Sequence, residues 1–196
     1  MSEPTEGWVV GIDLSLASTA LAAMHTRTGE LFLHRVRSTG KTTDTLAMKV
    51  ARYRSLSSDI ATAALACAPV AVAVEGALFS TSKDTSAHRR AGLWWRTVDL
   101  IDAAGVPVVE VPVSTVKKWG TGKGNASKDM MLAAAVRRFP QVTQNDEADA
   151  THIADLLAYL VGGAVVPRTK GRDTILAKIP RDGVPVLSEQ QDIAIH

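Results

Sequence analysis

The chain has 196 residues, of which 46% are hydrophobic, so it is long enough to bury the core of one globular domain. Its formal net charge of +2 is too small to indicate a nucleic-acid partner, so that case depends on how the basic residues are distributed. The single cysteine excludes an internal disulfide, and we find neither a secretory signal nor the roughly 20 apolar residues of a membrane span, so we expect a cytoplasmic protein without a membrane partner.

The first part of the chain predicts three antiparallel strands. Residues 8–13 form a short apolar run, residues 19–25 form another, and residues 31–37 place apolar side chains on one face. A turn centred on Gly29 joins the second of these strands to the third. The pattern therefore favours an antiparallel meander at the start of the fold.

The middle of the chain predicts helices that alternate with parallel strands. Residues 42–66 carry apolar side chains at helical spacing, and Pro69 ends this amphipathic helix. Residues 70–75 alternate Val and Ala, which suits a strand buried on both faces. Residues 86–104 predict a second helix and residues 106–111 a fifth strand, so the connection is expected to be a right-handed crossover.

The last third of the chain predicts a basic loop and two helices. Residues 117–128 are rich in Gly and Lys and are expected to form a loop, followed by helices at residues 128–139 and 146–161. The final residues show no clear period. We therefore expect one folded domain over residues 1–166 and an extended arm or flexible tail over residues 167–196.

The order of these elements predicts the fold class. Three antiparallel strands, followed by helix, strand, helix, strand and two helices, indicate an α/β fold with a five-stranded mixed sheet flanked by helices. This is the order of the ribonuclease H-like fold. The actin, Hsp70 and sugar-kinase ATPases begin with the same order, so topology alone leaves two classes of enzyme open.

Four acids are candidate metal ligands. Asp13 and Glu75 each end a strand expected to be buried, and Asp146 and Asp149 are three residues apart, on one face of the last predicted helix. Taken singly, each has a simpler role, since acids cap turns and favour the helix dipole. Converging together, they would repel one another unless cations neutralised them. His152, three residues after Asp149, is either a base beside the metals or an ordinary polar position on the helix.

Oxygen ligands select Mg²⁺ or Mn²⁺ rather than zinc. Two such ions about 4 Å apart activate a water and stabilise the leaving oxygen of a phosphodiester. The four acids therefore predict phosphodiester hydrolysis.

Basic residues gather in three stretches that could contact nucleic acid. Between residues 117 and 128, four lysines and no acid are interleaved with glycines, so both ammonium groups and backbone amides can approach phosphate. An ordinary solvated loop is the alternative. A second cluster follows Glu75 and a third lies near the C-terminus. Their members are Lys83, His88, Arg89, Arg90 and Arg96, and Arg168, Lys170, Arg172, Lys178 and Arg181.

Short motifs in these places resemble the RuvC family of Holliday junction resolvases, including members from bacteriophages, over residues 8–163. The residues that carry the resemblance are 11–15 with Thr19, 72–75, 116–117, 122–128 and 146–150. In this sequence Leu14 and Ser15 stand where the family usually has Pro-Gly, and Ala20 stands where glycine is common. The family's aromatic wedge usually lies three residues after the glutamate, where this chain has Leu78, with Phe79 one residue later.

The resemblance implies a homodimeric, RuvC-like nuclease that cuts branched DNA, above all four-way junctions, with two magnesium ions that manganese can replace. It implies that Asp13, Glu75, Asp146 and Asp149 hold the ions and act in catalysis. The helix with Trp94 and Trp95 would supply the dimer interface, together with Leu93, Val98 and residues 100–101. The candidate DNA-binding residues are Lys117, Lys118, Lys123, Lys128, Arg89, Arg90 and Phe79.

Three other functions remain open from the sequence. One is a flap, fork or RNA–DNA hybrid nuclease of the same fold. Another is an Hsp70-like or sugar-kinase-like ATPase, in which residues 11–15 with Ser18 and Thr19 would hold phosphate, although a second glycine-rich phosphate hairpin is not evident. The third is a catalytically silent DNA-binding module, against which the four intact acids argue.

Overall fold

The computed structural model describes residues 6–76, 86–163, 165, 167, 169–177, 179–181 and 183–185, and these contain one five-stranded sheet in the order β3-β2-β1-β4-β5. The strands are β1 Trp8–Asp13, β2 Ser18–His25, β3 Leu31–Arg37, β4 Ala71–Glu75 and β5 Val108–Val111. Strands β1, β2 and β3 are antiparallel, and β4 and β5 run parallel to β1. The predicted mixed sheet, three antiparallel strands followed by two parallel ones, is confirmed.

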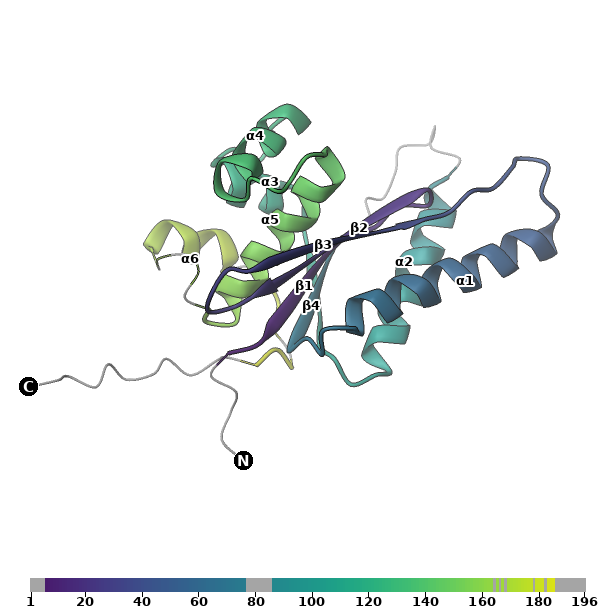
Figure 1. Cartoon of the computed structure of the whole chain (residues 1–196), viewed down its shortest axis with the longest axis horizontal. Coiled ribbons are helices and arrows are strands. Elements are labelled where there is room, and N and C mark those ends of the chain that lie inside the picture. The colour runs from purple at the N-terminus through teal and green to yellow at the C-terminus, as the bar shows by residue number, and fades with distance from the viewer. Residues whose placement is uncertain are drawn as a thin grey trace, which may run out of the picture.

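Helices cover both faces of the sheet (Figure 1). They are α1 Leu46–Leu65, α2 Ala87–Asp102, α3 Val113–Thr121, α4 Lys128–Arg138, α5 Asn145–Leu160 and α6 Lys170–Leu176. Helices α1 and α2 pack together on one face, whereas α5 lies on the other with α3, α4 and α6 around it. Within the described residues, no helix is both long and apolar enough to cross a bilayer.

The alternation of β1 builds a separate hydrophobic core on each face of the sheet. Val9 packs into the core that contains Ile153 and Leu157 of α5, whereas Val10 and Ile12 pack into the core of α1 and α2. Successive side chains of a strand point to opposite faces, so a strand buried on both faces must be apolar throughout. This burial carries β1 through the middle of the molecule and leaves Asp13 at its end.

A glycine in β1 lets α5 lie directly on the sheet. A Cβ atom added to Gly11 would lie 2.4 Å from the Ala150 carbonyl oxygen and 2.4 Å from the Ala154 nitrogen. Both are backbone atoms of α5, so only a residue without a side chain permits this contact. The close approach sets the start of α5 beside the end of β1, which is where Asp13 and Asp149 must meet.

The predicted loop over residues 117–128 is wrong in its first half, because residues 113–121 form helix α3. Pro112 precedes the helix in extended conformation, and Gly122, with φ of 79°, ends it in the left-handed region that favours glycine. Val116 and Trp119 are buried and supply its apolar face. Two apolar anchors among basic residues and glycines give too weak a periodicity to predict this helix.

The prediction of an extended arm or flexible tail after residue 167 is wrong for Lys170–Leu176, which form helix α6. The Thr169 hydroxyl caps the helix by accepting from the Arg172 amide at 3.3 Å. Leu176 is fully buried in the core under α5, and the Tyr159 hydroxyl donates to Asp173 at 3.0 Å. Contacts with residues distant in sequence stabilise this short helix, so its own pattern does not reveal it.

An ion pair of a buried acid with a surface arginine fixes α3 and α4 against α5. Asp155 is fully buried and accepts two hydrogen bonds from Arg138, at 2.6 and 2.7 Å, and one from the Trp119 indole at 2.7 Å. Since a buried charge is tolerated only when it is paired, this network requires the three helices to keep one arrangement. That arrangement holds the basic residues of α3 and α4 over the start of α5.

Candidate active site

Asp13 and Glu75 lie side by side at the carboxyl ends of two neighbouring parallel strands. Strands β1 and β4 pair Ile12 with Val74, and each acid is the next residue along its strand. Burial raises the pKa of Asp13 to about 7, and the charges of Asp149, Glu75 and Asp146 contribute to this rise in that order. The other three acids therefore lie close enough to act on the charge of Asp13, and their role as metal ligands stays a prediction.

Glu75 and Asp149 are subject to the same opposing effects. Burial, followed by the charge of Asp149, raises the pKa of Glu75 to about 7, while Lys117 and Lys128 act in the opposite direction. Burial also raises the pKa of Asp149, again opposed by Lys128 and Lys117. Both lysines therefore lie close enough to the acids to offset part of their repulsion.

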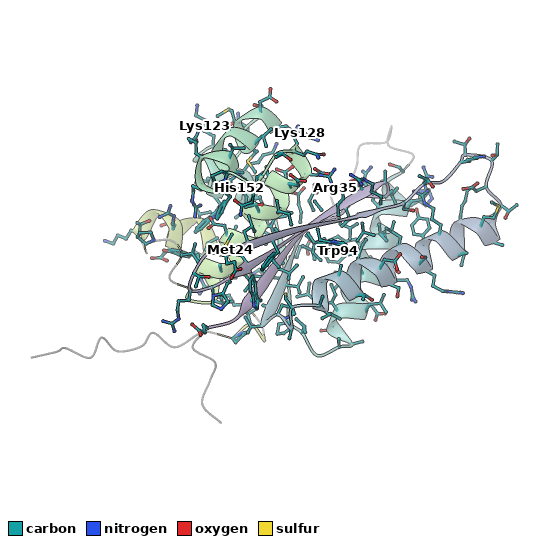
Figure 2. The ribbon with its side chains drawn as sticks, in the orientation of Figure 1. Met24, Arg35, Trp94, Lys123, Lys128 and His152 are labelled. Carbon is teal, nitrogen blue, oxygen red and sulfur yellow. The ribbon has the colours of Figure 1, made fainter. Side chains whose placement is uncertain are left out.

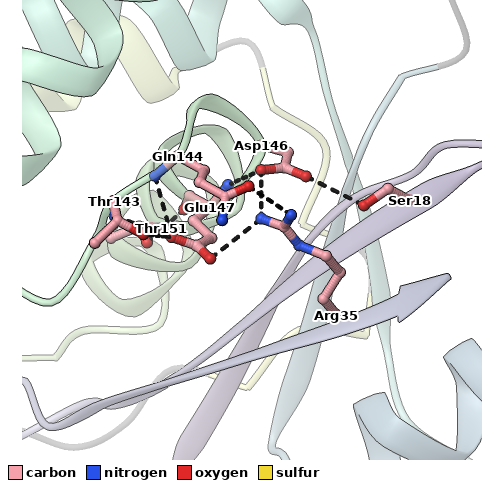
Figure 3. A network of polar contacts seen from close by, with 7 residues as sticks. All are labelled: Ser18, Arg35, Thr143, Gln144, Asp146, Glu147 and Thr151. Carbon is pink, nitrogen blue, oxygen red and sulfur yellow. Dashed lines mark hydrogen bonds and ion pairs between the residues drawn. The ribbon is translucent and has the colours of Figure 1, made fainter.

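Asp146 differs from the other three acids because a cation of the protein already contacts it (Figure 3). Arg35 on β3 donates to Asp146 Oδ1 at 2.7 Å, and the Ser18 hydroxyl donates to Oδ2 at 3.3 Å. The guanidinium also reaches Glu147 at 3.1 Å and Gln144 at 2.6 Å. Sequence reasoning missed Arg35. The two-residue period of β3 could have found it, because it places Arg35 on the same face of the strand as Leu31 and Leu33.

The basic residues predicted to contact DNA fall into different places. Lys117 on α3 and Lys128 at the start of α4 lie near the acids, while Lys118 and Lys123 are exposed in the same layer. Figure 2 shows Lys123 and Lys128 on the α3–α5 side of the sheet. All four lysines therefore lie on the same side of the sheet as α5, the helix that carries Asp146 and Asp149.

The two arginines of α2 that were predicted to contact DNA lie in different places. Arg90 lines a cavity of about 150 Å³ together with Asp13, Glu75 and Trp94, so it belongs to the site. Arg89 instead lines a groove between α1 and α2. Phe79, and with it Leu78 and Lys83, lies outside the described residues.

The donor chemistry of the site fits a divalent cation. The acids offer only carboxylate oxygens, which Mg²⁺ and Mn²⁺ prefer, and Asp13, Glu75 and Asp149 sit in surroundings that disfavour uncompensated negative charge. Among the residues that the structure describes, no three His, Cys, Asp or Glu side chains are grouped closely enough to form a complete metal cage. The contact of Asp146 with Arg35 is one way in which the arrangement departs from such a cage.

His152 faces away from the acids. Its side chain is buried, and Nε2 lies 3.0 Å from the carbonyl oxygen of Met131 on α4. Burial lowers the pKa of His152, and the charges that act on it are those of Asp155 and Arg138. Helix packing therefore directs its ring into the α4–α5 contact, and a part for this histidine in the chemistry stays a hypothesis.

The expected dimer surface on α2 is smaller than the sequence suggests. Leu93 and Ile101 are fully buried and Trp94 is 7% exposed, with its indole nitrogen donating to the Glu75 carbonyl oxygen at 2.9 Å. These residues pack against the sheet and cannot contact a second chain. Trp95 is 67% exposed, so the two adjacent tryptophans do point in different directions, as the helical period requires.

Comparison with known proteins supports the fold. No protein-family model matches the chain, and no curated protein does. Among solved structures, RuvC of Thermus thermophilus is 19% identical with a TM-score of 0.60, and the match covers 90% of this chain and 97% of that one. The same protein in complex with a Holliday junction substrate gives 21% identity and a TM-score of 0.61, over 76% and 90% of the two chains.

A yeast mitochondrial Holliday junction resolvase matches less closely, with 14% identity and a TM-score of 0.50 over 77% of each chain. The chain therefore has a ribonuclease H-like fold. Within that class its architecture is the one seen in RuvC, so the resemblance indicated by the motifs is confirmed at the level of the fold.

Proposed function

We propose that this chain is a magnesium-dependent DNA endonuclease that resolves four-way junctions during recombination or repair, in the cytoplasm of a bacterial cell or phage-infected host. The observation that carries the proposal is that Asp13 and Glu75 end neighbouring parallel strands, with the start of α5 and its Asp149 packed beside β1. Neighbouring carboxylates repel one another, and a divalent cation would offset this repulsion. The RuvC-like fold supports the substrate class, because T. thermophilus RuvC has been solved with a Holliday junction substrate.

In this proposal the side chains of the site divide into two groups. Asp13, Glu75 and Asp149, with Asp146 beside them, hold two Mg²⁺ ions, for which Mn²⁺ substitutes. When bound, these ions supply a nucleophilic water and stabilise the leaving oxygen of the phosphodiester. Lys117 and Lys128 lie close enough to the acids to contact the scissile phosphate or its neighbours, and they orient the DNA strand by charge.

Symmetric cutting of a four-way junction requires two sites related by a twofold axis, so we propose that the chain acts as a homodimer. Of the apolar residues expected at the interface, Trp95 on α2 is the large side chain left exposed. A large, rigid aromatic side chain of this kind is typical of the centre of an interface. The proposed interface is therefore centred on Trp95 rather than on the full apolar stretch of α2.

The first prediction tests the substrate. Labelled four-way junctions, flaps, RNA–DNA hybrids and linear duplexes are incubated with the protein and Mg²⁺ or EDTA. We expect paired symmetric nicks in the four-way junction, none in EDTA, and loss of cutting with Asp149→Asn but not with Asp59→Asn, an exposed acid on α1. Preferential cutting of flaps or hybrids would show that the four-way junction is not the preferred substrate. ATP turnover without any cutting would contradict the nuclease proposal.

The second prediction concerns DNA binding. Replacing both Lys117 and Lys128 by alanine should weaken junction binding and lower the slope of log Kd against log salt, by about 0.9 for each phosphate that a lysine neutralises in the original protein. Fluorescence anisotropy at several salt concentrations measures this slope. Lys49→Ala, on α1 at the opposite face of the sheet, serves as the control. An unchanged slope in the double variant would show that these lysines do not contact phosphate.

A further inference from the structure

Arg35 joins the edge of the sheet to the first turn of α5. One terminal nitrogen donates to Asp146 Oδ1 at 2.7 Å and to Glu147 at 3.1 Å, and the other donates to Gln144 at 2.6 Å (Figure 3). The Arg35 side chain is 15% exposed and that of Asp146 is 25% exposed. The pair is therefore partly shielded from water, where charge-assisted hydrogen bonds are stronger than at an open surface.

This contact makes the four acids electrostatically unequal. Asp13, Glu75 and Asp149 are half-buried, and none of them takes part in the ion pairs seen among the described residues. Asp146, by contrast, has a guanidinium at hydrogen-bond distance. Its Oδ1 also accepts from the Glu147 amide at 3.0 Å, which leaves Oδ2, with the Ser18 hydroxyl at 3.3 Å, as the less occupied oxygen.

We propose that Arg35 is a positioning residue that acts as a built-in counter-ion of Asp146 and thereby weakens cation binding on the Asp146 side of the site. This inference rests on the proposed function. A divalent cation that approaches Asp146 meets a carboxylate whose charge is already balanced by a nearby fixed positive charge. The cation held by Asp13, Glu75 and Asp149 therefore binds first, and the one that shares Asp146 binds more weakly.

The start of α5 does not depend on Arg35 for its place. Glu147 accepts hydrogen bonds from the Thr143 amide at 2.9 Å and the Gln144 amide at 3.2 Å, which closes the first turn. The close contact of Gly11 with α5 fixes the next turns on the sheet. Removing the guanidinium therefore removes a charge from Asp146 while its helix stays where it is.

The test is a calorimetric titration of the metal-free protein with Mn²⁺, in the absence of DNA. In the variant Arg35→Gln the weaker class of Mn²⁺ sites should bind about tenfold more tightly, because the competing charge is gone. Arg35→Lys keeps the charge and should bind within about twofold of the original protein. Arg37→Gln, an exposed arginine two residues along β3, removes the same charge beside the network and should change nothing.

A double variant assigns the effect to Asp146. In the background Asp146→Asn, the further change Arg35→Gln should no longer tighten binding, because the carboxylate on which the arginine acts is absent. Persistence of the tightening there would overturn the proposal, as would tighter binding by Arg35→Lys. Weaker or unchanged binding by a folded Arg35→Gln protein would leave Arg35 a structural role only.

These outcomes are distinct from failure of the proposed function. Mn²⁺ binding that is lost in Asp13→Asn but insensitive to Arg35→Gln would refute the role of Arg35 alone. Absence of Mn²⁺ binding in the original protein and in every variant would refute the metal site, and the role of Arg35 with it. Circular dichroism and thermal unfolding confirm that each variant is folded.

Discussion

Replacing Asp13 by asparagine should lower junction cleavage by about a thousandfold or more and, in EDTA, should make the protein more stable at pH 8. The reduced cleavage follows from removing the central acid of the site. The gain in stability follows from its surroundings, since burial and the charges of Asp149, Glu75 and Asp146 raise its pKa from 3.8 to about 7. The acid that we propose for catalysis is therefore expected to destabilise the metal-free fold.

The sign of the pH dependence follows from proton binding. Between pH 4 and pH 7 the folded chain keeps a proton on Asp13 that the unfolded chain has released, so the free energy of unfolding falls as the pH rises through this window. Above the folded pKa this fall is complete. The asparagine variant lacks the titrating carboxyl, so its free energy of unfolding should not fall in this way. It should be more stable than the original protein by about 1 to 3 kcal/mol at pH 8, with a smaller difference at pH 5.

Urea unfolding at pH 5 and pH 8, in EDTA and in Mg²⁺, measures these differences. Mg²⁺ should stabilise the original protein at pH 8 more than the variant, because binding to the folded state alone shifts the unfolding equilibrium. Asp59→Asn, an exposed acid on α1, should show neither effect. Equal stabilities of the original protein and Asp13→Asn at both pH values would contradict the convergence of the acids, and undiminished cleavage would contradict the assigned site.

The change Gly11→Ala should destabilise the fold by about 3 kcal/mol or more and lower cleavage by about a hundredfold in the protein that remains folded. The added Cβ would lie 2.4 Å from two backbone atoms of α5, Ala150 O and Ala154 N, and neither can rotate away. The helix must therefore shift off the sheet. Because α5 carries Asp149 and β1 carries Asp13, the shift should separate two acids of the proposed metal site.

Gly92→Ala is the matched control for this second variant. A Cβ at Gly92, in the middle of α2, meets nothing within 4 Å, so alanine there should be neutral or stabilise the helix by up to about 1 kcal/mol. Thermal unfolding and junction cleavage are measured for both variants. Normal stability and activity of Gly11→Ala would show that α5 does not need the close contact with β1.

Local pattern is sufficient to predict most of the fold. The apolar runs that form β1 and β4, and the 3.6-residue period that forms α1, depend only on neighbours along the chain, and their ends differ from the predictions by a few residues. Helices α3 and α6 escape prediction because their stability comes from Trp119, Leu176 and the Tyr159–Asp173 contact, all of which depend on distant partners. A buried helix can be predicted from its periodicity only where several apolar residues recur at helical spacing.

By itself, the sequence determined that Asp13 and Glu75 each end a buried strand and that Asp149 lies one helical turn beyond Asp146, because apolar runs and the helical period depend on neighbours along the chain. Only the tertiary structure decided which charges balance which. Arg35 and Asp146 are 111 residues apart in sequence, and the packing of α5 on the sheet brings them to 2.7 Å. Packing likewise directed His152 towards Met131 and away from the acids, since the direction of a side chain on a buried helix is set by the helices around it.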